Sequence, residues 1–150
     1  MSWSNQVLLV VALGLNILCL QSCSTEPEAL RYGVDACYSC KMTLADNRFG
    51  AELVTRKGKI YKFDDLNCML NFYHGGGVDA AEFEHRLVIN YEKPGSFLNA
   101  DESFYVKSKE IRSPMASELA SFESYDRAMV HRKQWEGIFL AWGEVTTQFK

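Results

Sequence analysis

Hydrophobic and polar positions alternate over two neighbouring stretches of the chain, residues 49–55 and 59–63. Alternation with a period of two is typical of strands that have one buried face. Lys57 and Gly58 lie between the two stretches and suit a short turn. The pattern therefore predicts a β-hairpin over residues 49–63.

A helix is expected directly after this hairpin. Either Asp64 or Asp65 can cap its first turn, and apolar residues then recur at helical spacing over residues 66–73. Three consecutive glycines at 75–77 end the pattern. The hairpin and the helix form the first predicted unit.

A similar order of elements returns in the second half of the chain. Residues 87–91 and 104–107 have the composition of strands, residues 125–135 that of a helix capped by Ser124, and residues 137–145 that of a closing strand. Two weakly similar halves of strands and helices predict the α+β class. With 150 residues, of which 47% are hydrophobic, one compact domain is expected.

The N-terminal stretch differs from the rest, because residues 7–20 are almost entirely aliphatic and no charge precedes Glu26. This stretch is short for a permanent membrane span and ends in Leu20-Gln21-Ser22-Cys23, which is typical of a lipoprotein signal peptide. We expect cleavage after residue 22 and lipidation of Cys23. An uncleaved signal anchor, in which Cys23 is an ordinary apolar residue, is the alternative.

Lipidation of Cys23 divides the chain into three parts. These are a signal peptide over 1–22, a lipidated acidic tether over 23–36 and a folded domain over 37–150. The protein is then anchored to a bacterial membrane and faces the periplasm or the cell exterior.

The formal charge of -3 is spread along the chain, and without a basic cluster nucleic acid is not an expected partner.

Sulfur is concentrated at two places in the predicted domain. Cys37, Cys40 and Met42 lie within six residues, and Cys68 and Met69 are adjacent near the start of the first helix. Thiolates and thioethers are soft ligands that suit Cu(I), whereas zinc sites hardly use methionine. The three cysteines cannot all pair with one another within one chain. We therefore expect a sulfur-lined Cu(I) site.

Two other interpretations of the cysteines stay open. Cys37, Cys40, Cys68 and His74 together have the composition of a structural Cys3His zinc site. Cys37-x-x-Cys40 also has the spacing of a thiol–disulfide centre, although it precedes a hairpin instead of a helix. A disulfide between Cys37 and Cys40 in the absence of metal is a milder form of the same idea.

Several motifs in order along residues 37–145 resemble the NosL family of nitrous oxide reductase accessory proteins. They are Cys37-x-x-Cys40-x-Met42, Phe63-Asp64-Asp65-Leu66-x-Cys68-Met69, Ala100-x-x-x-Phe104-Tyr105-Val106-x-Ser108 and Ser113-Pro114-Met115-x-x-x-Leu119-x-x-Phe122. The resemblance implies a pair of small homologous strand-strand-helix(-strand) units packed into one compact domain. It also implies a metallochaperone and not an enzyme.

The resemblance carries particular ligands onto this chain. Cys40 and Met42 stand where the family has its Cys-Gly-Met pair, with Lys41 in place of the usual glycine. Met69 and Met115 are the next candidates, after which Cys37 and Cys68 complete the set of candidate metal ligands. Ser113 replaces a glycine that many relatives have.

The resemblance further implies a cargo and its destination. A NosL-like protein binds Cu(I) outside the cytoplasm and delivers it to the copper centre of apo nitrous oxide reductase. A copper-exporting membrane assembly is a further candidate partner. A lipoprotein for copper storage or copper defence would have much the same sequence.

Overall fold

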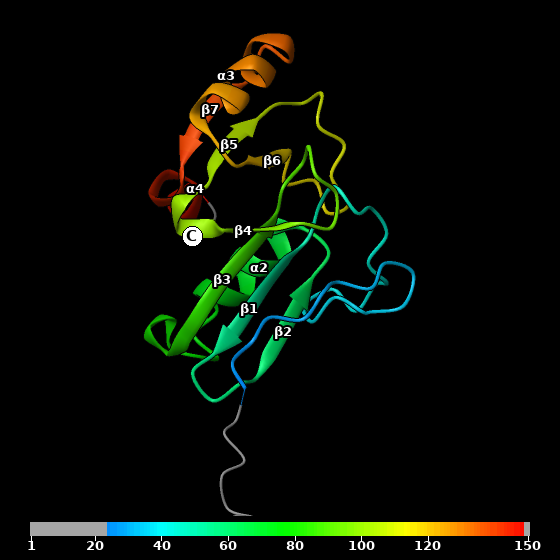
Figure 1. Cartoon of the computed structure of the whole chain (residues 1–150), viewed down its shortest axis with the longest axis vertical. Coiled ribbons are helices and arrows are strands. Elements are labelled where there is room, and N and C mark those ends of the chain that lie inside the picture. The colour runs from blue at the N-terminus through cyan, green and yellow to red at the C-terminus, as the bar shows by residue number, and fades with distance from the viewer. Residues whose placement is uncertain (1–23, 149–150) are drawn as a thin grey trace, which may run out of the picture.

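Two antiparallel sheets form the framework of the computed structural model, which describes residues 24–148 (Figure 1). The first sheet has the strand order β2-β1-β3-β4 and consists of β1 (Ala51–Thr55), β2 (Ile60–Phe63), β3 (Phe83–Ile89) and β4 (Phe97–Asn99). The second sheet has the order β6-β5-β7 and consists of β5 (Phe104–Lys107), β6 (Leu119–Phe122) and β7 (Ile138–Ala141).

Helices connect and flank these strands. The α-helices are α2 (Leu66–His74), α3 (Tyr125–Gln134) and α4 (Trp142–Gln148), and two 3₁₀ turns are Ala80–Glu82 and Ala100–Glu102. Asp65 caps α2 and Ser124 caps α3, in each case with a side-chain oxygen that accepts from a backbone N–H of the first turn. Among the described residues, no helix has both the length and the apolar character that a membrane crossing needs.

The two halves of the domain have the same topology. In the first half, β1 pairs antiparallel with β2 and with β3, and α2 lies between β2 and β3 in the chain. In the second half, β5 pairs antiparallel with β6 and with β7, and α3 lies between β6 and β7. The α+β fold with two strand-strand-helix-strand units is therefore confirmed.

The C-terminal end differs from the expected closing strand over residues 137–145. Strand β7 stops at Ala141, and α4 begins at Trp142. The Glu144 carboxylate accepts from the backbone N–H of Ala141 at 2.8 Å, which supports this first turn. Trp142 packs on the ring of Tyr105 with 6.0 Å between ring centroids. The apolar run thus reflects two short elements that pack on the same sheet.

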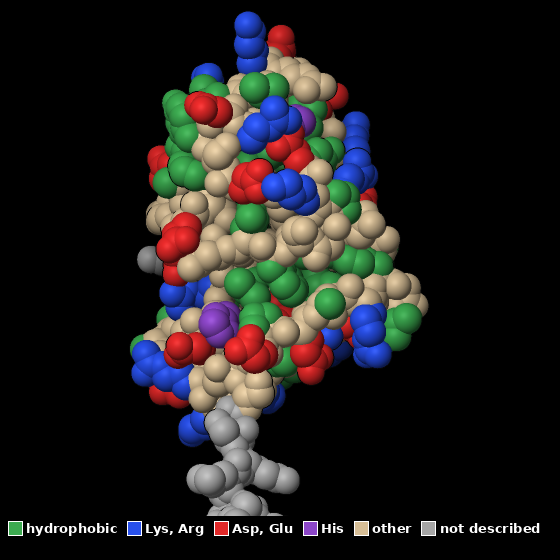
Figure 2. Space-filling model, in the orientation of Figure 1, with side chains coloured by type: hydrophobic (Ala, Val, Ile, Leu, Met, Phe, Trp, Pro, Cys, Tyr) green, Lys and Arg blue, Asp and Glu red, His purple; other side chains and the backbone are tan. Residues whose placement is uncertain are grey.

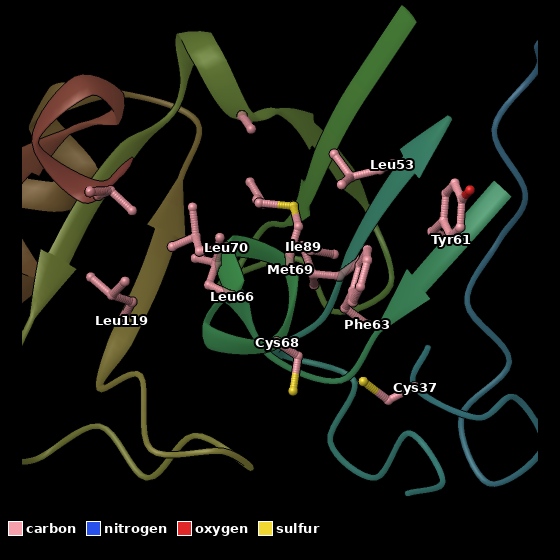
Figure 3. Packing of buried hydrophobic residues seen from close by; sticks show 14 of the residues in the cluster. Cys37, Leu53, Tyr61, Phe63, Leu66, Cys68, Met69, Leu70, Ile89 and Leu119 are labelled. Atoms are coloured by element: carbon pink, nitrogen blue, oxygen red, sulfur yellow. The ribbon is translucent and has the colours of Figure 1, made fainter. Parts of the chain in front are cut away.

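The main core lies between the first sheet and α2 and continues to the second sheet. All five residues of β1 are buried. Figure 3 shows Leu66 and Leu70 of α2 packed between strands of the first sheet and Leu119 of β6. Burial from both sides fixes α2 within the domain, and α2 carries Cys68.

Residues 24–36, which we call the N-terminal strap, pass across the first sheet (Figure 1). Leu30 is buried, and the Tyr32 hydroxyl donates to the Phe49 carbonyl at 2.6 Å. Asp35 is also buried and accepts from Lys62 Nζ at 2.9 Å. The later part of the expected tether thus packs on the domain. Cys23 and the expected signal peptide lie outside the described residues, so cleavage and lipidation stay predictions.

Candidate metal centre

A small hairpin over residues 33–44 carries the first two cysteines. At its neck the Cys37 N–H donates to the Met42 carbonyl at 2.8 Å, and the Lys41 N–H donates to the Cys37 carbonyl at 3.0 Å. The tip, residues 38–41, therefore forms a tight turn that holds Cys40 close to Cys37.

Two hydrogen bonds fasten this tip to the first sheet and to α2. The Tyr38 N–H donates to the Lys62 carbonyl at 2.7 Å, and the Ser39 hydroxyl donates to the Cys68 carbonyl at 2.9 Å. The Tyr38 ring packs edge-on against Tyr61 and Phe72, with centroid distances of 4.7 and 5.1 Å. Segments far apart in sequence are thereby fixed together.

Cys68 reaches the same place from the first turn of α2. Asp65 caps this turn by accepting from the Asn67 N–H at 3.2 Å, and Cys68 is the third residue of the helix. Leu66 and Leu70 on the same helix are buried in the core, which fixes the direction of the helix and of the Cys68 side chain.

The three cysteines form one cluster. Their Sγ atoms all lie within 4.8 Å of one another, and all three are free thiols. Cys37 and Cys68 are buried, whereas Cys40 is half-buried and opens the cluster toward solvent. Figure 3 shows the Cys37 sulfur directed toward Cys68, beside the start of α2. Sulfurs that bind one ion at about 2.3 Å are about 4 Å apart, so small adjustments would let all three reach a single metal.

Contact between the thiols makes their proton affinities unequal. A hydrogen bond from the Cys68 thiol lowers the pKa of Cys37. The same hydrogen bond, together with burial, raises the pKa of Cys68. The helix N-terminus alone would favour a thiolate at Cys68, but donation to Cys37 outweighs it. In the metal-free cluster, Cys37 is therefore the thiol that loses its proton first.

The four candidate methionine and thiol positions taken from the resemblance lie in different surroundings. Cys40 belongs to the thiol cluster, and the Met42 side chain is 57% exposed beside it in sequence. Met69 is 0% exposed and packs in the core. Met115 is half-buried and packs against the same core.

The loop that contains Met115 is fastened to the start of α2. Asp65 Oδ2 accepts from the N–H groups of Met115 and Ser117, at 2.8 and 3.3 Å, and Asn67 Nδ2 donates to the Met115 carbonyl at 3.0 Å. Asp65 thus caps α2 and positions a loop of the second unit. Sequence reasoning found only the capping role, because a bond between residues 50 positions apart leaves no local pattern.

The alternative Cys3His zinc site is not supported by the arrangement of the described residues. Among the described histidine, cysteine, aspartate and glutamate residues, the three cysteines alone group closely enough to share a metal ion. His74 is the last residue of α2, six residues beyond Cys68, and a helix rises about 9 Å over that distance. The imidazole is therefore too far along the helix to complete the cluster.

Lys41 occupies a backbone conformation that favours glycine. Its φ is +65°, in the left-handed region, where a Cβ atom costs about 1 kcal/mol. This explains why a glycine suits the position between the cysteine and the methionine. The Lys41 side chain folds back, with its ammonium 4.4 Å from the centroid of the Tyr38 ring.

Comparison with known proteins agrees with this geometry. The sequence model of the NosL family matches residues 32–149. The chain belongs to the NosL family. A solved structure described as the copper chaperone NosL from Shewanella denitrificans is similar to this chain, with a TM-score of 0.68 and 19% identity. The match covers 81% of this chain and 96% of that one, which establishes a shared NosL fold. No curated protein sequence matches the chain.

Proposed function

We propose that this NosL protein is a copper chaperone that holds Cu(I) at the cluster of Cys37, Cys40 and Cys68 and passes it to apo nitrous oxide reductase. The observation that carries this function is the grouping of three free thiols within 4.8 Å of one another. Such a set of soft donors favours Cu(I), and no chemical change in a substrate is required.

The burial of the three thiols suits transfer as well as binding. Cys37 and Cys68 are shielded, which protects bound Cu(I) from solvent, whereas Cys40 is half-buried and Met42 is 57% exposed. Donors of an acceptor protein can therefore approach from the side of Cys40 before the buried thiolates release the ion. Asp65 and Asn67 hold the backbone of Met115 at the start of α2, which makes its thioether a candidate for a further donor.

Other functions fit the cluster less well. Structural zinc lacks its histidine, since His74 is outside the group. Storage of copper needs many donors, whereas this cluster has the size of a site for one ion.

Anchoring through Cys23 would raise the local concentration of the donor near a membrane-associated copper exporter.

Metal titration of the full chain, kept reduced and anaerobic in detergent, tests the binding step. We expect one Cu(I) per chain, and we expect Cys37→Ser and Cys68→Ser each to weaken Cu(I) affinity by at least about 100-fold, because each removes a buried thiolate. Met129→Leu is the matched control, because this thioether lies on α3 in the other unit. Zinc that binds with equal stoichiometry and resists displacement by Cu(I) would contradict copper as the cargo.

Delivery needs a separate measurement. The Cu(I)-loaded chain is mixed with apo nitrous oxide reductase, and copper is measured in each protein after separation. Transfer that is faster than from a small-molecule Cu(I) complex of equal affinity supports a chaperone. Copper that stays on this chain would indicate storage or defence instead.

A further inference from the structure

Glu52 is a buried carboxylate outside the thiol cluster. It lies in β1, on the face of the first sheet opposite α2, and its exposed fraction is 0%. In the sheet register it stands between Lys62 of β2 and Leu87 of β3. A fully buried carboxylate needs several donors to remain ionised at low cost.

The N-terminal strap covers Glu52 but satisfies only half of it. The Glu28 N–H donates to Glu52 Oε1 at 3.0 Å. Oε2 is buried and has no hydrogen-bond partner among residues 24–148. The carboxyl group therefore contacts the strap as an acceptor on one side and has no donor on the other.

The charged groups that face Glu52 do not compensate for this burial. Lys62 is the nearby cation, and its Nζ is already shared between Asp35, at 2.9 Å, and Glu28, at 3.1 Å. Glu28 and Asp35 are like charges on the strap, and the position opposite in β3 is the neutral Leu87. Burial accordingly raises the pKa of Glu52 from 4.5 to about 7, although the Glu28 N–H and Lys62 act against it.

We propose that protonation of Glu52 controls the docking of the first part of the strap, residues 24–30, on the sheet. With a proton on its carboxyl group, Glu52 is neutral and the strap can cover it. After the proton leaves, the charge requires water, and water reaches Glu52 only when residues 24–30 move away. The later part of the strap stays docked through the Asp35–Lys62 ion pair and the hydrogen bond from the Tyr32 hydroxyl to the Phe49 carbonyl.

The direction of the pH effect follows from the two states of Glu52. In the undocked state the carboxyl group is exposed and titrates at its ordinary pKa of 4.5, whereas in the docked state its pKa is about 7. The docked state therefore holds one extra proton between these two values. Docking is strongest below pH 4.5, weakens by at most about ten-fold per pH unit up to about pH 7, and is constant above that.

The strap joins two parts of the protein that matter for delivery. It continues directly into the hairpin that carries Cys37, and its first residue follows the expected lipidation site. Release of residues 24–30 would lengthen the free chain by about 3.3 Å per residue. The distance between the membrane and the domain would then depend on pH.

Hydrogen–deuterium exchange of the full chain in detergent tests this switch. The amides of residues 24–30, above all that of Glu28, are compared at pH 5.0 and pH 7.5, corrected for intrinsic exchange and referenced to the amides of α3. We expect protection in the native sequence to fall at least about ten-fold over this interval. Glu52→Gln and Glu52→Leu, which carry no titrating group at this position, should show no such fall.

A matched control separates Glu52 from the other carboxylates of the sheet. Glu84→Gln removes a 48%-exposed carboxylate of β3 that pairs with Arg56, and it should keep the full pH dependence. The Leu variant fills the position with an apolar side chain in case the Gln variant folds poorly. Equal protection at both pH values in the native sequence, or an undiminished fall in both Glu52 variants, would overturn the switch. None of these exchange measurements depends on metal binding.

Discussion

The two strand-strand-helix-strand units share a topology but differ in how deeply their helices are buried. Helix α2 of the first unit buries Leu66, Cys68, Met69 and Leu70, whereas α3 of the second unit buries only Ala128. Figure 1 accordingly shows α3 at the periphery and α2 behind the first sheet. The same chain order therefore produces one central and one peripheral helix.

Helix α3 is held by contacts of a different kind. Glu92 pairs with Arg127, and it lies 2.8 Å from His131 Nε2, while the His131 ring stacks on Phe122. Figure 2 shows charged side chains distributed over the surface of the upper part of the molecule, where this unit lies. Such partly exposed pairs contribute less than the burial of apolar side chains.

This difference explains where the metal centre lies. A site that must hold thiols within a few ångströms needs rigid elements on each side. Helix α2 is fixed by the core and by Asp65, which also holds the Met115 loop, so its first turn is a fixed platform for Cys68. The corresponding turn of α3 has no buried support of this kind.

The largest expected effect is on stability, and it contrasts the two helices directly. Leu70→Ala removes a fully buried side chain from α2 and should lower the free energy of unfolding by about 2–5 kcal/mol. Val130→Ala removes a 53%-exposed side chain from α3 and should change it by less than about 0.5 kcal/mol. Urea unfolding measures both. Similar losses in the two variants would mean that the helices support the domain equally.

A smaller effect is expected at the two helix caps. Asp65→Ala removes the cap of α2 and leaves the Met115 and Ser117 amides without their acceptor, so we expect a loss of about 2 kcal/mol. Ser124→Ala removes only the cap of α3, which is worth about 1 kcal/mol.

Cu(I) affinity separates the two capping roles further. Asp65→Ala should weaken Cu(I) binding because it frees both the Cys68 turn and the Met115 loop, whereas Ser124→Ala should leave it unchanged. Titration with a competing Cu(I) chelator measures the difference. Unchanged affinity in both variants would mean that the thiol cluster does not depend on the support from Asp65.

The elements with strong local signals could be predicted from the sequence. Alternating apolar residues predicted β1 and β2. The caps of α2 and α3 were predicted because an aspartate or a serine precedes apolar residues at helical spacing. Strand β4 was missed because its three residues are too few to show a period. Strand β6 was missed because all four of its residues are buried, so that no alternation of apolar and polar positions marks it. Strand β3 begins at Phe83, four residues before the expected start at 87, because three consecutive polar residues, Glu84–Arg86, interrupt the apolar pattern.

The candidate site was predictable in its composition but not in its geometry. The spacing of Cys37 and Cys40 indicated one half of the thiol cluster, and sulfur beside sulfur drew attention to Cys68. The contact between these segments depends on hydrogen bonds from Ser39 to the Cys68 carbonyl and from Tyr38 to the Lys62 carbonyl, which join residues far apart in the sequence. Packing of Cys68 and Met69 into different surroundings is likewise a property of the tertiary structure.

The smallest expected effect concerns backbone strain, which both units contain. Lys41 beside the thiol cluster and Glu118 beside the Met115 loop have φ values of +65° and +58°. At each position the glycine variant should be more stable than the alanine variant by about 1 kcal/mol, because only glycine adopts this conformation without Cβ strain. In an ordinary helix or strand the order is reversed. Thermal unfolding of Lys41→Gly and Lys41→Ala, with the same pair at Glu118, measures this difference. Equal values at the two positions would assign the strain to the left-handed φ itself, whereas a difference at Lys41 alone would assign it to the hairpin that carries the thiols.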